Sequence, residues 1–548
     1  MGYDGKFSKI RVSDIKCRNK SEFSKFKRSK RNVYFVLIFE SLILKNCFEF
    51  RISCFGIIFF VANIDELRNE RLKKLKNLRS AGIWPYPGET KRTHAIGAAL
   101  SDWKNLEDAQ KEIIVAGRLR SMRGHGGMLF GDIQDGTGKI QILLKKDGLG
   151  EKSYQFFADN FDVGDFVQIR GTALTTKRGE KTVLAVDYKM LAKALRPLPD
   201  KWHGLQDTEE RYRKRYLDLI FNEDVRKKFV IRTEIVRAIR NFLDEHGFME
   251  VETPILQTIY GGATAKPFKT YFNAYDMDVF LRIAPELFLK KLLVGGFEKV
   301  YEIARNFRNE GVDKQHNPDF TMLEFYWAWS DYRQLMKFTE EMMAYILQKV
   351  LGTAKITYQG NEIDFAAPWP RVEYLDLLKK EAKIDYRASS REGLAVKAKE
   401  LGVEIDKNAG KAEIADEIYK KYCRPKIIPP TFLIHYPKES KPLAKSVEPD
   451  GPIVANFQLL VNGFEIVNAF SEQNDPIEQA ARLKEQEELF KQGFQEAQRT
   501  DTDFIEALEY GMPPCAGLGM GIDRLAALLT DSNALREIIL FPLMKPKN

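Results

Sequence analysis

A single arginine, Arg308, stands where a strand-like run over residues 300–307 ends and a charged loop begins. Its guanidinium can fork onto a phosphate or carboxylate oxygen. The loop and the aromatic-rich run after it carry side chains suited to a base edge, a terminal phosphate and a flat ring, namely Glu310, His316, Asn317 and Phe320. This composition indicates a nucleoside triphosphate site, although an ordinary solvated loop between two strands would have the same composition.

A second group of residues with chemical potential lies near the end of the chain, in AGLGMGIDRLAALL over 516–529. Gly517, Gly519 and Gly521 alternate along a strand-like run, which allows another backbone or a ligand to approach closely. We expect Asp523 to cap a helix that begins with Arg524. Arg524 would then lie at the positive end of a helix dipole, where anions bind. A packed strand-turn-helix with a surface arginine is the plainer alternative.

The elements that must position these residues follow from the hydrophobic pattern. From residue 226 onward long helices alternate with strands, and residues 330–450 carry helical patterns without a catalytic signal of their own. Ahead of them, residues 112–197 show about five short alternating strands with Gly turns and one intervening helix, a pattern that fits an OB-fold barrel. Residues 64–80 predict a helix with a basic side, and that side can lie on RNA or simply face solvent.

Three segments together resemble the class II aminoacyl-tRNA synthetases. Arg308 with its loop resembles motif 2, GLGMGIDRLAALL resembles motif 3, and the helix and Pro254-bearing strand over 226–256 resemble motif 1. The blocks GGATAKPF, LRIAPELFLK and FEIVNAFSEQNDP are similar to the lysine-specific branch of the family. The resemblance covers residues 63–548. It implies an α+β fold, with an N-terminal OB-fold β-barrel followed by a class II antiparallel β-sheet domain flanked by helices.

The expected domains follow from this resemblance and from composition. They are an atypical extension over 1–62, a helical segment over 63–110, an anticodon-binding OB fold over 111–200, a linker over 201–225, and a catalytic domain over 226–548 with an inserted helical module in 330–450. In the barrel, Phe130 and Gln141 suit base stacking and edge recognition, and Arg118 suits a base or phosphate. The resemblance implies anticodon contacts for these three residues, and barrel core is the alternative for Phe130.

The resemblance also implies the first reaction, attack of an amino-acid carboxylate on the α-phosphate of ATP. Arg308 and Arg524 would be catalytic, with Arg308 on both the carboxylate and the α-phosphate. His316 and Arg524 would hold the γ-phosphate. Around the nucleotide, Glu310 would bind the adenine amine, Phe320 would stack on the ring and Asn317 would assist. Mg²⁺ needs oxygen ligands, and Glu465 matches one family carboxylate, whereas Gln458 stands where a second is expected. An amide oxygen brings no charge, so the number of metal ions is open.

The charge of the substrate decides its identity. A lysine ε-ammonium is costly to bury without a partner, so its pocket needs carboxylates such as Glu286, Glu324 and Glu472. By resemblance, Glu472 and Tyr326 face the ε-ammonium, and Glu286 and Gly262 face the α-amino group with Glu324 nearby. The same resemblance implies Arg308 and Asn468 at the substrate carboxylate and Phe470 along the aliphatic stem. Surface or salt-bridging roles are the alternative for each glutamate.

Bulk charge does not identify a nucleic-acid partner. Of the formal net charge of +9, residues 1–31 supply most, with 11 Lys or Arg against 3 Asp or Glu. Residues 32–62 are apolar but interrupted by charges, and no uncharged run there is long enough for a bilayer. We expect the natural start to lie near Val61, with a true targeting extension as the alternative. The scattered cysteines fit a reducing cytoplasm rather than a disulfide framework or a metal site.

The leading hypothesis is a cytoplasmic, homodimeric lysine-activating synthetase joined through motif 1, using ATP, Mg²⁺, L-lysine and tRNA(Lys) without a membrane. An aspartate or asparagine enzyme is the alternative within the class, but those enzymes usually carry Gln in place of Glu286, and an enzyme for an acidic substrate should display arginines. A paralogue that ligates lysine to protein usually lacks the OB domain. An RNA-binding or signalling protein without catalysis would not need Arg308 and Arg524.

Overall fold

The computed structural model describes residues 64–199, 207–406, 409–492 and 497–547. These residues belong to two compact units, divided between residues 204 and 205. The extension over 1–62, with its expected start near Val61, lies outside the described residues. Among the described residues, no helix combines the length and the apolar character needed to cross a bilayer.

The first unit is a closed five-stranded barrel, in the order β1-β2-β3-β5-β4. Along β1 and β2 buried and partly exposed residues alternate, because successive side chains of a strand point to opposite faces. The intervening helix that the sequence predicts lies between the third and fourth strands, over Glu151–Asn160, and buries Phe157. The elements are α2 Ile64–Ser80, α3 Ile96–Ser101, α4 Trp103–Asp108, β1 Glu112–His125, β2 Met128–Gln134, β3 Lys139–Lys145, α5 Lys146–Leu149, α6 Glu151–Asn160, β4 Phe166–Thr175 and β5 Lys181–Ala192.

Helix α2 forms over the predicted residues, and part of its basic side packs on the barrel. Leu75 and Leu78 are buried. Arg71 donates to the carbonyls of Val163, Ala194 and Arg196, and Lys74 pairs with Asp162 at 2.7 Å. These two cations therefore anchor the helix to the barrel and are not available to an RNA partner.

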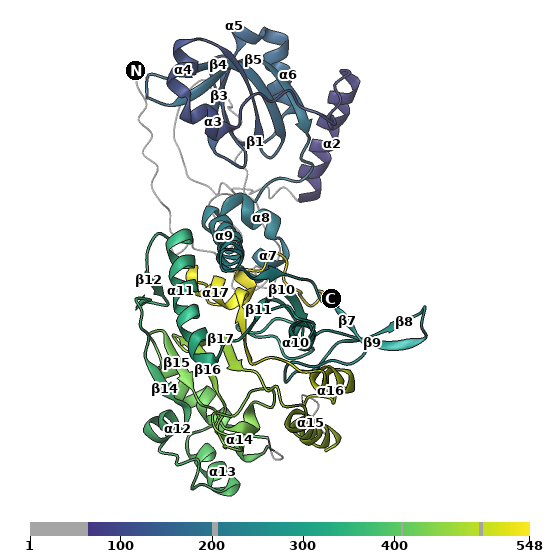
Figure 1. Cartoon of the computed structure of the whole chain (residues 1–548). Helices are drawn as coiled ribbons and strands as arrows, with labels where there is room; N and C mark the ends of the chain where they lie inside the picture. Colours follow the sequence, from purple (N-terminus) through teal and green to yellow (C-terminus); the bar gives the residue numbers. More distant parts are fainter. Residues whose placement is uncertain (1–63, 200–206, 407–408, 493–496, 548) are drawn as a thin grey trace, which may run out of the picture. The chain divides into compact units, whose positions relative to one another are not determined.

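The second unit is built on one eight-stranded, mainly antiparallel sheet in the order β14-β15-β16-β17-β18-β11-β10-β6 (Figure 1). The motif 2 hairpin is its β10–β11 pair, and the motif 3 glycines lie on β18 beside it. The strands of the unit are β6 Met249–Glu250, β7 Leu256–Gln257, β8 Lys269–Phe272, β9 Met277–Leu281, β10 Lys299–Phe307, β11 Asp319–Ala328, β12 Lys355–Tyr358, β13 Asn361–Asp364, β14 Arg371–Glu373, β15 Thr431–Ile434, β16 Asn456–Val461, β17 Phe464–Ser471 and β18 Cys515–Gly521.

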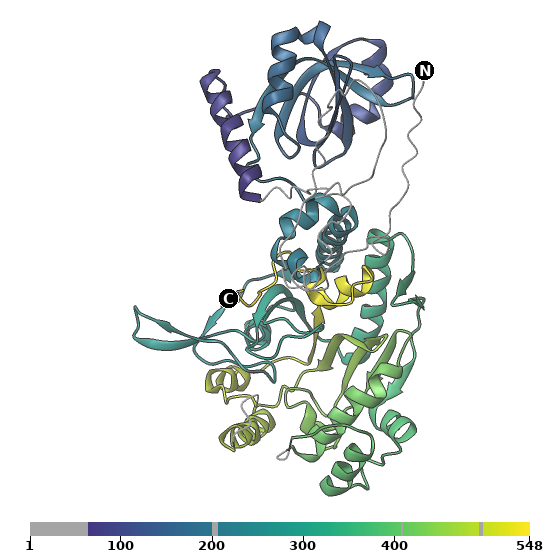
Figure 2. The ribbon, with the colours of Figure 1, turned by 180° about the vertical axis from the view of Figure 1, so that it is seen from behind.

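Helices cover this sheet on both faces. On one face α9, α11 and α17 pack against side chains such as Phe325, Phe457 and Leu518. On the other face α10 and α12–α14 share a core with Tyr326 and Phe470, and the green helices gather at the β14–β15 edge in both views (Figures 1 and 2). The helices are α7 Thr208–Arg213, α8 Arg215–Phe221, α9 Glu223–Glu245, α10 Glu286–Val294, α11 Tyr332–Val350, α12 Tyr374–Leu377, α13 Arg391–Glu400, α14 Lys411–Ile418, α15 Pro476–Lys491, α16 Thr502–Glu509 and α17 Ile522–Leu529, with shorter helical turns η2 Leu378–Ala382, η3 Tyr419–Cys423, η4 Arg424–Lys426, η5 Lys438–Ser440 and η6 Leu535–Glu537.

Three expectations about local structure need correction. The second part of the expected linker over 201–225 forms α7 and α8, because the buried guanidinium of Arg215 pairs with Asp218 at 2.7 Å and donates to the carbonyl of Arg536. The strand expected in motif 1 is split into two short strands, β6 and β7, and Pro254, which cannot donate to a ladder, lies between them. The region over 330–450 holds short strands as well as helices, namely β12 to β15.

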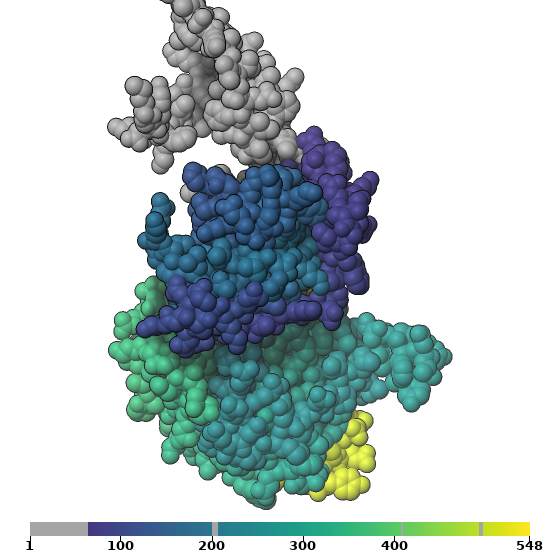
Figure 3. Space-filling view, turned by 90° about the horizontal axis from the view of Figure 1, so that it is seen from above, coloured from purple at the N-terminus to yellow at the C-terminus, as the bar shows by residue number. Residues whose placement is uncertain are grey.

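One hairpin projects from the second unit. Strands β8 and β9 form an arm that extends beyond the other elements (Figure 1), and it is visible as a teal projection in the space-filling view (Figure 3). Its exposed aromatic residues are Tyr271, Phe272 and Tyr275.

Candidate active site

The centre of the site is a row of residues that crosses the sheet. Gly519 on β18 pairs with Glu324 of β11 on one side and with Asn468 of β17 on the other. Asn468 in turn pairs with Gln458 of β16. Directly opposed residues of an antiparallel sheet share a face, so these side chains point the same way. Two predicted lysine residues, Glu324 and Asn468, therefore share a face with the predicted metal residue Gln458.

The glycines of β18 form the floor of this face. Two residues along, Gly517 pairs with Tyr326 and Phe470. A Cβ at Gly517 would overlap the Glu472 carboxylate and the Tyr326 ring, and one at Gly519 would overlap the end of Met322. The alternation predicted from sequence thus has a clear reason, because side chains from both neighbouring strands use the space above the glycines.

Three buried carboxylates line one end of the face. Glu286 begins α10, Glu324 lies on β11 and Glu472 follows β17, and each is at most 6% exposed. A fully buried lysine from α10, Lys290, lies between two of them, with its Nζ 2.5 Å from Glu286 Oε1 and 2.5 Å from Glu472 Oε2. Sequence reasoning missed Lys290, although it lies one helical turn after Glu286, a spacing that brings side chains together.

Tyrosine and glycine complete this carboxylate pocket. The Tyr326 hydroxyl donates to Glu324 Oε2 at 3.3 Å. Gly262, in a left-handed conformation with φ of +84°, lies against Glu286, and a Cβ there would come within 2.8 Å of the Glu286 Cβ. The structure therefore brings together the pairs expected at the two ammonium groups of a lysine substrate, although Glu472 already has Lys290 as a partner.

Burial and the closeness of the charged groups determine the pKa values in this pocket. Burial raises the pKa of Glu324 well above its usual value, and the nearby Glu286 raises it further. Burial and Glu286 likewise raise the pKa of Glu472, outweighing the opposite effect of Lys290. Burial disfavours the ammonium of Lys290, yet Glu286 and Glu472 outweigh it and raise its pKa. The pocket thus holds one fixed cation and an excess of negative groups that ionise reluctantly.

Arg308, the residue expected at the nucleotide, follows the end of β10 and is near enough to Glu324 for their charges to interact. Its guanidinium lies over the Phe320 ring at 5.0 Å, and its backbone N–H donates to the Pro318 carbonyl at 2.8 Å. The Nε of Arg308 is buried without a hydrogen-bond partner. Burial lowers its pKa against the attraction of Glu310, a loop carboxylate exposed to solvent. A buried donor without a partner is costly, so this atom points to an anion that completes the site.

Arg524 and His316 meet as the resemblance implies. Arg524 donates from Nη1 to the Glu465 carbonyl at 3.1 Å, and its Nη2 lies 3.4 Å from His316 Nε2. The other ring nitrogen of His316 lies 2.9 Å from Asp313 Oδ2, which orients the imidazole. Two nitrogen-bearing side chains from separate segments thus converge where a terminal phosphate is expected.

Asn317 has a structural contact in this loop. Its amide nitrogen donates to the backbone carbonyl of Asp319 at 2.7 Å and to the side chain of the same residue at 2.9 Å. Asn317 is 5% exposed, and its Oδ1 has no hydrogen-bond partner. The side chain therefore braces the end of the loop at the start of β11.

The expected helix cap at Asp523 is wrong. Helix α17 begins at Ile522 with Gly521 as its N-cap, so Asp523 lies inside the first turn. Its carboxylate accepts from the Thr321 backbone N–H at 2.9 Å and from Arg232 at 2.8 Å. Donors from β11 and α9 therefore bind the carboxylate in place of the backbone N–H groups of the helix. Arg524 still lies in the first turn, near the positive end of the helix.

The expected metal residues, Glu465 and Gln458, differ in their surroundings. Burial works to raise the pKa of Glu465, but Arg524 and three lysine or arginine neighbours outweigh it and lower the pKa. Gln458 is 5% exposed, and its Oε1 accepts from Tyr436 at 2.6 Å and from Tyr419 at 3.2 Å. Glu465 fits a magnesium ligand, whereas the Gln458 oxygen is already engaged by two hydroxyls.

The surroundings of Glu465 contain a further cation that sequence reasoning missed. Lys441, just after η5, donates from Nζ to Asn468 Oδ1 at 3.0 Å. Burial lowers its pKa, while Glu465 and Asp416 act to raise it. No pattern in the sequence distinguishes Lys441 from the neighbouring lysines, because its position depends on a contact between distant segments. Across the described residues, no cluster of three or more His, Cys, Asp or Glu side chains suits a metal ion.

The barrel carries the three residues expected at an anticodon. Phe130 is partly exposed and lies outside the barrel core, so the core alternative is wrong. Gln141, on the adjacent strand, points to the same outer face and accepts from the Thr182 hydroxyl at 2.9 Å. Arg118 lies farther along β1, where it donates to the Gly164 carbonyl at 2.9 Å and lies over the Phe166 ring.

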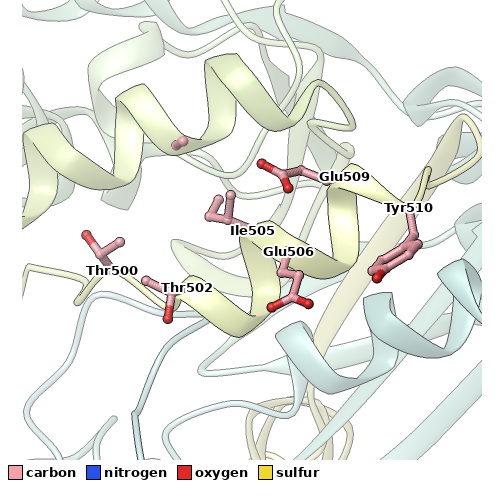
Figure 4. Close-up of a pocket in the computed structure, with 7 residues that line it drawn as sticks. Thr500, Thr502, Ile505, Glu506, Glu509 and Tyr510 are labelled. Carbon is pink, nitrogen blue, oxygen red and sulfur yellow. The ribbon is translucent and has the colours of Figure 1, made fainter.

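A surface hollow elsewhere in the second unit takes no part in this arrangement. It lies between α15 and α16 and is lined by Thr500, Thr502, Ile505, Glu506 and Tyr510 among others (Figure 4). None of its lining residues belongs to the row across the sheet or to the carboxylate pocket.

Comparison with known families agrees with this geometry. Residues 207–545 match the tRNA synthetases class II (D, K and N), and residues 113–198 match the OB-fold nucleic acid binding domain. The chain belongs to the class II tRNA synthetases. The synthetase match begins at α7, which agrees with the packing of α7 and α8 on the second unit. The predicted fold class, a barrel followed by a class II sheet domain, is confirmed.

Curated relatives of this class II synthetase are similar over most of its length. The lysine–tRNA ligase of Pelotomaculum thermopropionicum is 50% identical over 488 residues, covering 88% of this chain and 96% of the relative. That of Carboxydothermus hydrogenoformans is 49% identical, covering 88% and 99%. That of Aquifex aeolicus is 50% identical over 439 residues, covering 80% and 74%.

Proposed function

We propose that this synthetase is a lysine–tRNA ligase, which activates L-lysine with ATP and transfers it to the 3′ end of tRNA(Lys). The observation that carries the proposal is the charge of the pocket. Glu286 and Glu472 pair with the single ammonium of Lys290, and Glu324 lies close to Glu286, so two negative charges remain when all three ionise. A bound lysine brings two ammonium groups. The lysine-specific relatives support the same assignment.

The carboxylate pocket also argues against the alternative within the class. An aspartate side chain would meet Glu472, whose cationic partner Lys290 is shared with Glu286, and burying like charges together is costly. An asparagine side chain would leave the surplus carboxylates without cations. A basic substrate therefore suits this pocket best.

In the first step, an oxygen of the lysine carboxylate attacks the α-phosphorus of ATP. A new C–O–P bond forms, the bond to the β-phosphate oxygen breaks, and diphosphate leaves with its electron pair. Such a step needs in-line positioning and neutralisation of charge more than covalent help. Arg308 supplies a guanidinium between carboxylate and α-phosphate, and its unpartnered Nε is a donor available for that purpose.

In the second step, a hydroxyl of the terminal ribose of tRNA attacks the lysyl carbonyl, and AMP leaves with the C–O electron pair.

Arg524 and His316 would hold the γ-phosphate end before diphosphate departs. Phe320 would offer its ring to adenine and Glu310 its carboxylate to the adenine amine. Gly262, Tyr326, Asn468 and Phe470 would enclose lysine as the resemblance implies.

Glu465 would hold Mg²⁺ together with phosphate oxygens, and the ion would neutralise the charge of the triphosphate. Its carboxylate stays ionised readily, because Arg524 and its neighbours lower its pKa. Gln458 would at most assist, since two tyrosine hydroxyls already donate to its oxygen.

The outer face of the barrel would bind the anticodon in the cytoplasm. Phe130 offers a stacking surface and Gln141 an amide edge on adjacent strands, features that suit single-stranded RNA. Replacing Phe130 with Leu should weaken tRNA use roughly tenfold and leave lysine-dependent diphosphate exchange unchanged. A loss of exchange would instead indicate a folding defect.

The homodimer expected through motif 1 has a matching surface. Apolar side chains are exposed along the segment after α9, namely Met249, Ile255, Leu256 and Ile259. Clustered exposed apolar residues mark association surfaces. Sedimentation of the whole protein, compared with a Leu256→Asp variant, tests this assignment, and a wild-type monomer at micromolar concentration would contradict it.

Amino-acid-dependent diphosphate–ATP exchange tests the function directly. Lysine should be the one strong substrate, and charging should be strongest with tRNA(Lys). Aspartate and asparagine are the matched negative substrates. Exchange driven by either of them, or none with lysine, would refute the proposal. Transfer of lysine to protein rather than to tRNA would favour the paralogue.

A further inference from the structure

The region around Glu465 has an unusual charge composition. Its carboxylate is influenced by four cations, Arg524, Lys441, Arg424 and Lys420. One of them is partly neutralised, because Lys420 pairs with Asp416 at 2.6 Å. Positive charge therefore exceeds negative charge before any nucleotide or metal ion binds.

Gln458 contributes no anionic ligand to this region. Its Oε1 accepts from the hydroxyls of Tyr436 and Tyr419 at 2.6 and 3.2 Å, which uses the lone pairs that a metal would need. A second metal position next to Gln458 thus lacks both a negative charge and a free oxygen.

Lys441 lies beside the place where a second metal ion would be expected. Its ammonium donates to Asn468 Oδ1 at 3.0 Å, and Asn468 is the direct cross-strand partner of Gln458. The ammonium also lies 5.2 Å from the centre of the Tyr436 ring, whose hydroxyl donates to Gln458. The hydrogen-bond partner of Lys441 is thus a neutral amide, which leaves its positive charge available to an anion.

We propose that the Lys441 ammonium takes the place of one Mg²⁺ ion at the nucleotide end of the site. This inference rests on the proposed function, since it assigns a cation to the ATP-dependent step. A lysine ammonium is a compact point charge that can neutralise a phosphate oxygen, and a preorganised charge of this kind stabilises a transition state without recruiting an ion. Glu465 would remain as the ligand of a metal that arrives with the nucleotide.

The effect of a bound triphosphate agrees with this role. Burial lowers the pKa of Lys441, and the carboxylates of Glu465 and Asp416 only partly counter it. The negative charge of a nearby phosphate favours the charged form of a lysine. Nucleotide binding would therefore secure the ammonium state at the time when it is needed.

Metal counting tests the inference on the intact protein. Free Mn²⁺ is measured by electron paramagnetic resonance during titration of the enzyme, with lysine and a non-hydrolysable ATP analogue present. The wild type should bind about one Mn²⁺ per occupied site, and the double variant Gln458→Glu with Lys441→Met should bind about one more. Two or more Mn²⁺ per site in the wild type would overturn the proposal.

Lysine-dependent exchange supplies the second measurement. Lys441→Met should lower the exchange rate roughly 10²-fold, as the loss of one preorganised charge does, and Lys441→Arg should retain most of it. The matched control is Lys438→Met in the same segment, because Lys438 pairs with Glu478 at the surface and should be dispensable. Equal rates for Lys441→Met and the wild type would overturn the proposal.

Two further outcomes separate this inference from the proposed function. Adding Gln458→Glu to Lys441→Met should restore part of the exchange, with a steeper dependence on free Mg²⁺; no recovery in a double variant that binds the extra Mn²⁺ would overturn the replacement. Circular dichroism checks that each variant is folded. Failure of the proposed function has a different signature, because the wild type would then show no lysine-dependent exchange at any Mg²⁺ concentration.

Discussion

The two ends of the active-site face are oppositely charged and are built from different kinds of elements. The acidic end takes Glu324 from a strand and Glu286 from the first turn of a helix, and both are buried. The cationic end takes Arg308 and His316 from a loop and Lys441 from an irregular segment. On the proposed assignment, the carboxylates that would hold lysine thus come from regular elements or directly follow one, whereas most of the cations that would meet the triphosphate come from irregular segments.

The strongest test of this contrast removes one cation, Arg308, from the cationic end. Arg308→Gln should lower lysine-dependent exchange roughly 10³-fold, because a donor aimed at developing charge is lost. Arg305→Gln is the matched control, since Arg305 lies three residues earlier, on β10, but pairs with Asp319 and donates to Thr321 at 2.9 Å. Steady-state kinetics of lysine-dependent exchange measure both variants. Equal losses of exchange rate in both would show that Arg308 has no special role at the cationic end.

A pair of matched glutamine substitutions tests whether the two ends act on different substrates. Glu472→Gln should raise the KM for lysine roughly 10²-fold, because a charge-assisted contact is lost, and should change the KM for ATP far less. Glu465→Gln should show the reverse, with its main effect on ATP and Mg²⁺. Equal effects of Glu472→Gln on lysine and ATP would count against the pocket assignment.

A smaller effect is expected from filling the floor of the acidic end. Gly517→Ala places a methyl group against Glu472 and Tyr326, and overpacking of this kind should raise the KM for lysine roughly tenfold. Gly88→Ala is the control, because a Cβ there meets nothing within 4 Å. An unchanged lysine KM in a folded Gly517→Ala protein would show that the substrate does not use this floor.

The smallest expected effect is a difference in pH dependence between the ends. Burial raises the pKa of Glu324 and of Glu472, so the empty pocket retains protons that an arriving ammonium must displace. Lysine binding should therefore strengthen between about pH 6 and about pH 8 and release protons. Calorimetry in two buffers of different ionisation enthalpy measures the release. Proton uptake on lysine binding would contradict the assignment.

Much of the site follows from sequence because it lies on regular strands. Phe320, Glu324 and Tyr326 alternate along β11, and the glycines alternate along β18, so their common face is determined by the two-residue period. The motif blocks then place Arg308 and Arg524 at the ends of elements. These local patterns need no knowledge of the three-dimensional fold.

The rest depends on contacts between distant segments. Lys290 reaches Glu472 and Lys441 reaches Asn468 only after the sheet has formed, and neither lysine belongs to a distinctive pattern. Asp523 looked like a helix cap, yet donors from β11 and α9 bind its carboxylate. Strands such as β14 escaped notice because three residues are too few to show a period.

The spacing of the strands fixes the distance between two residues of the cross-strand row. Glu324 and Asn468 stand on opposite sides of Gly519, so their separation is two strand spacings, roughly 9.6 Å. Backbone hydrogen bonds maintain that spacing, and a change of side chain cannot stretch it. On the proposed assignment, Glu324 would lie near the α-amino group and Asn468 at the carboxylate, so the sheet would fix the distance between these two contacts for an amino acid of any side-chain length.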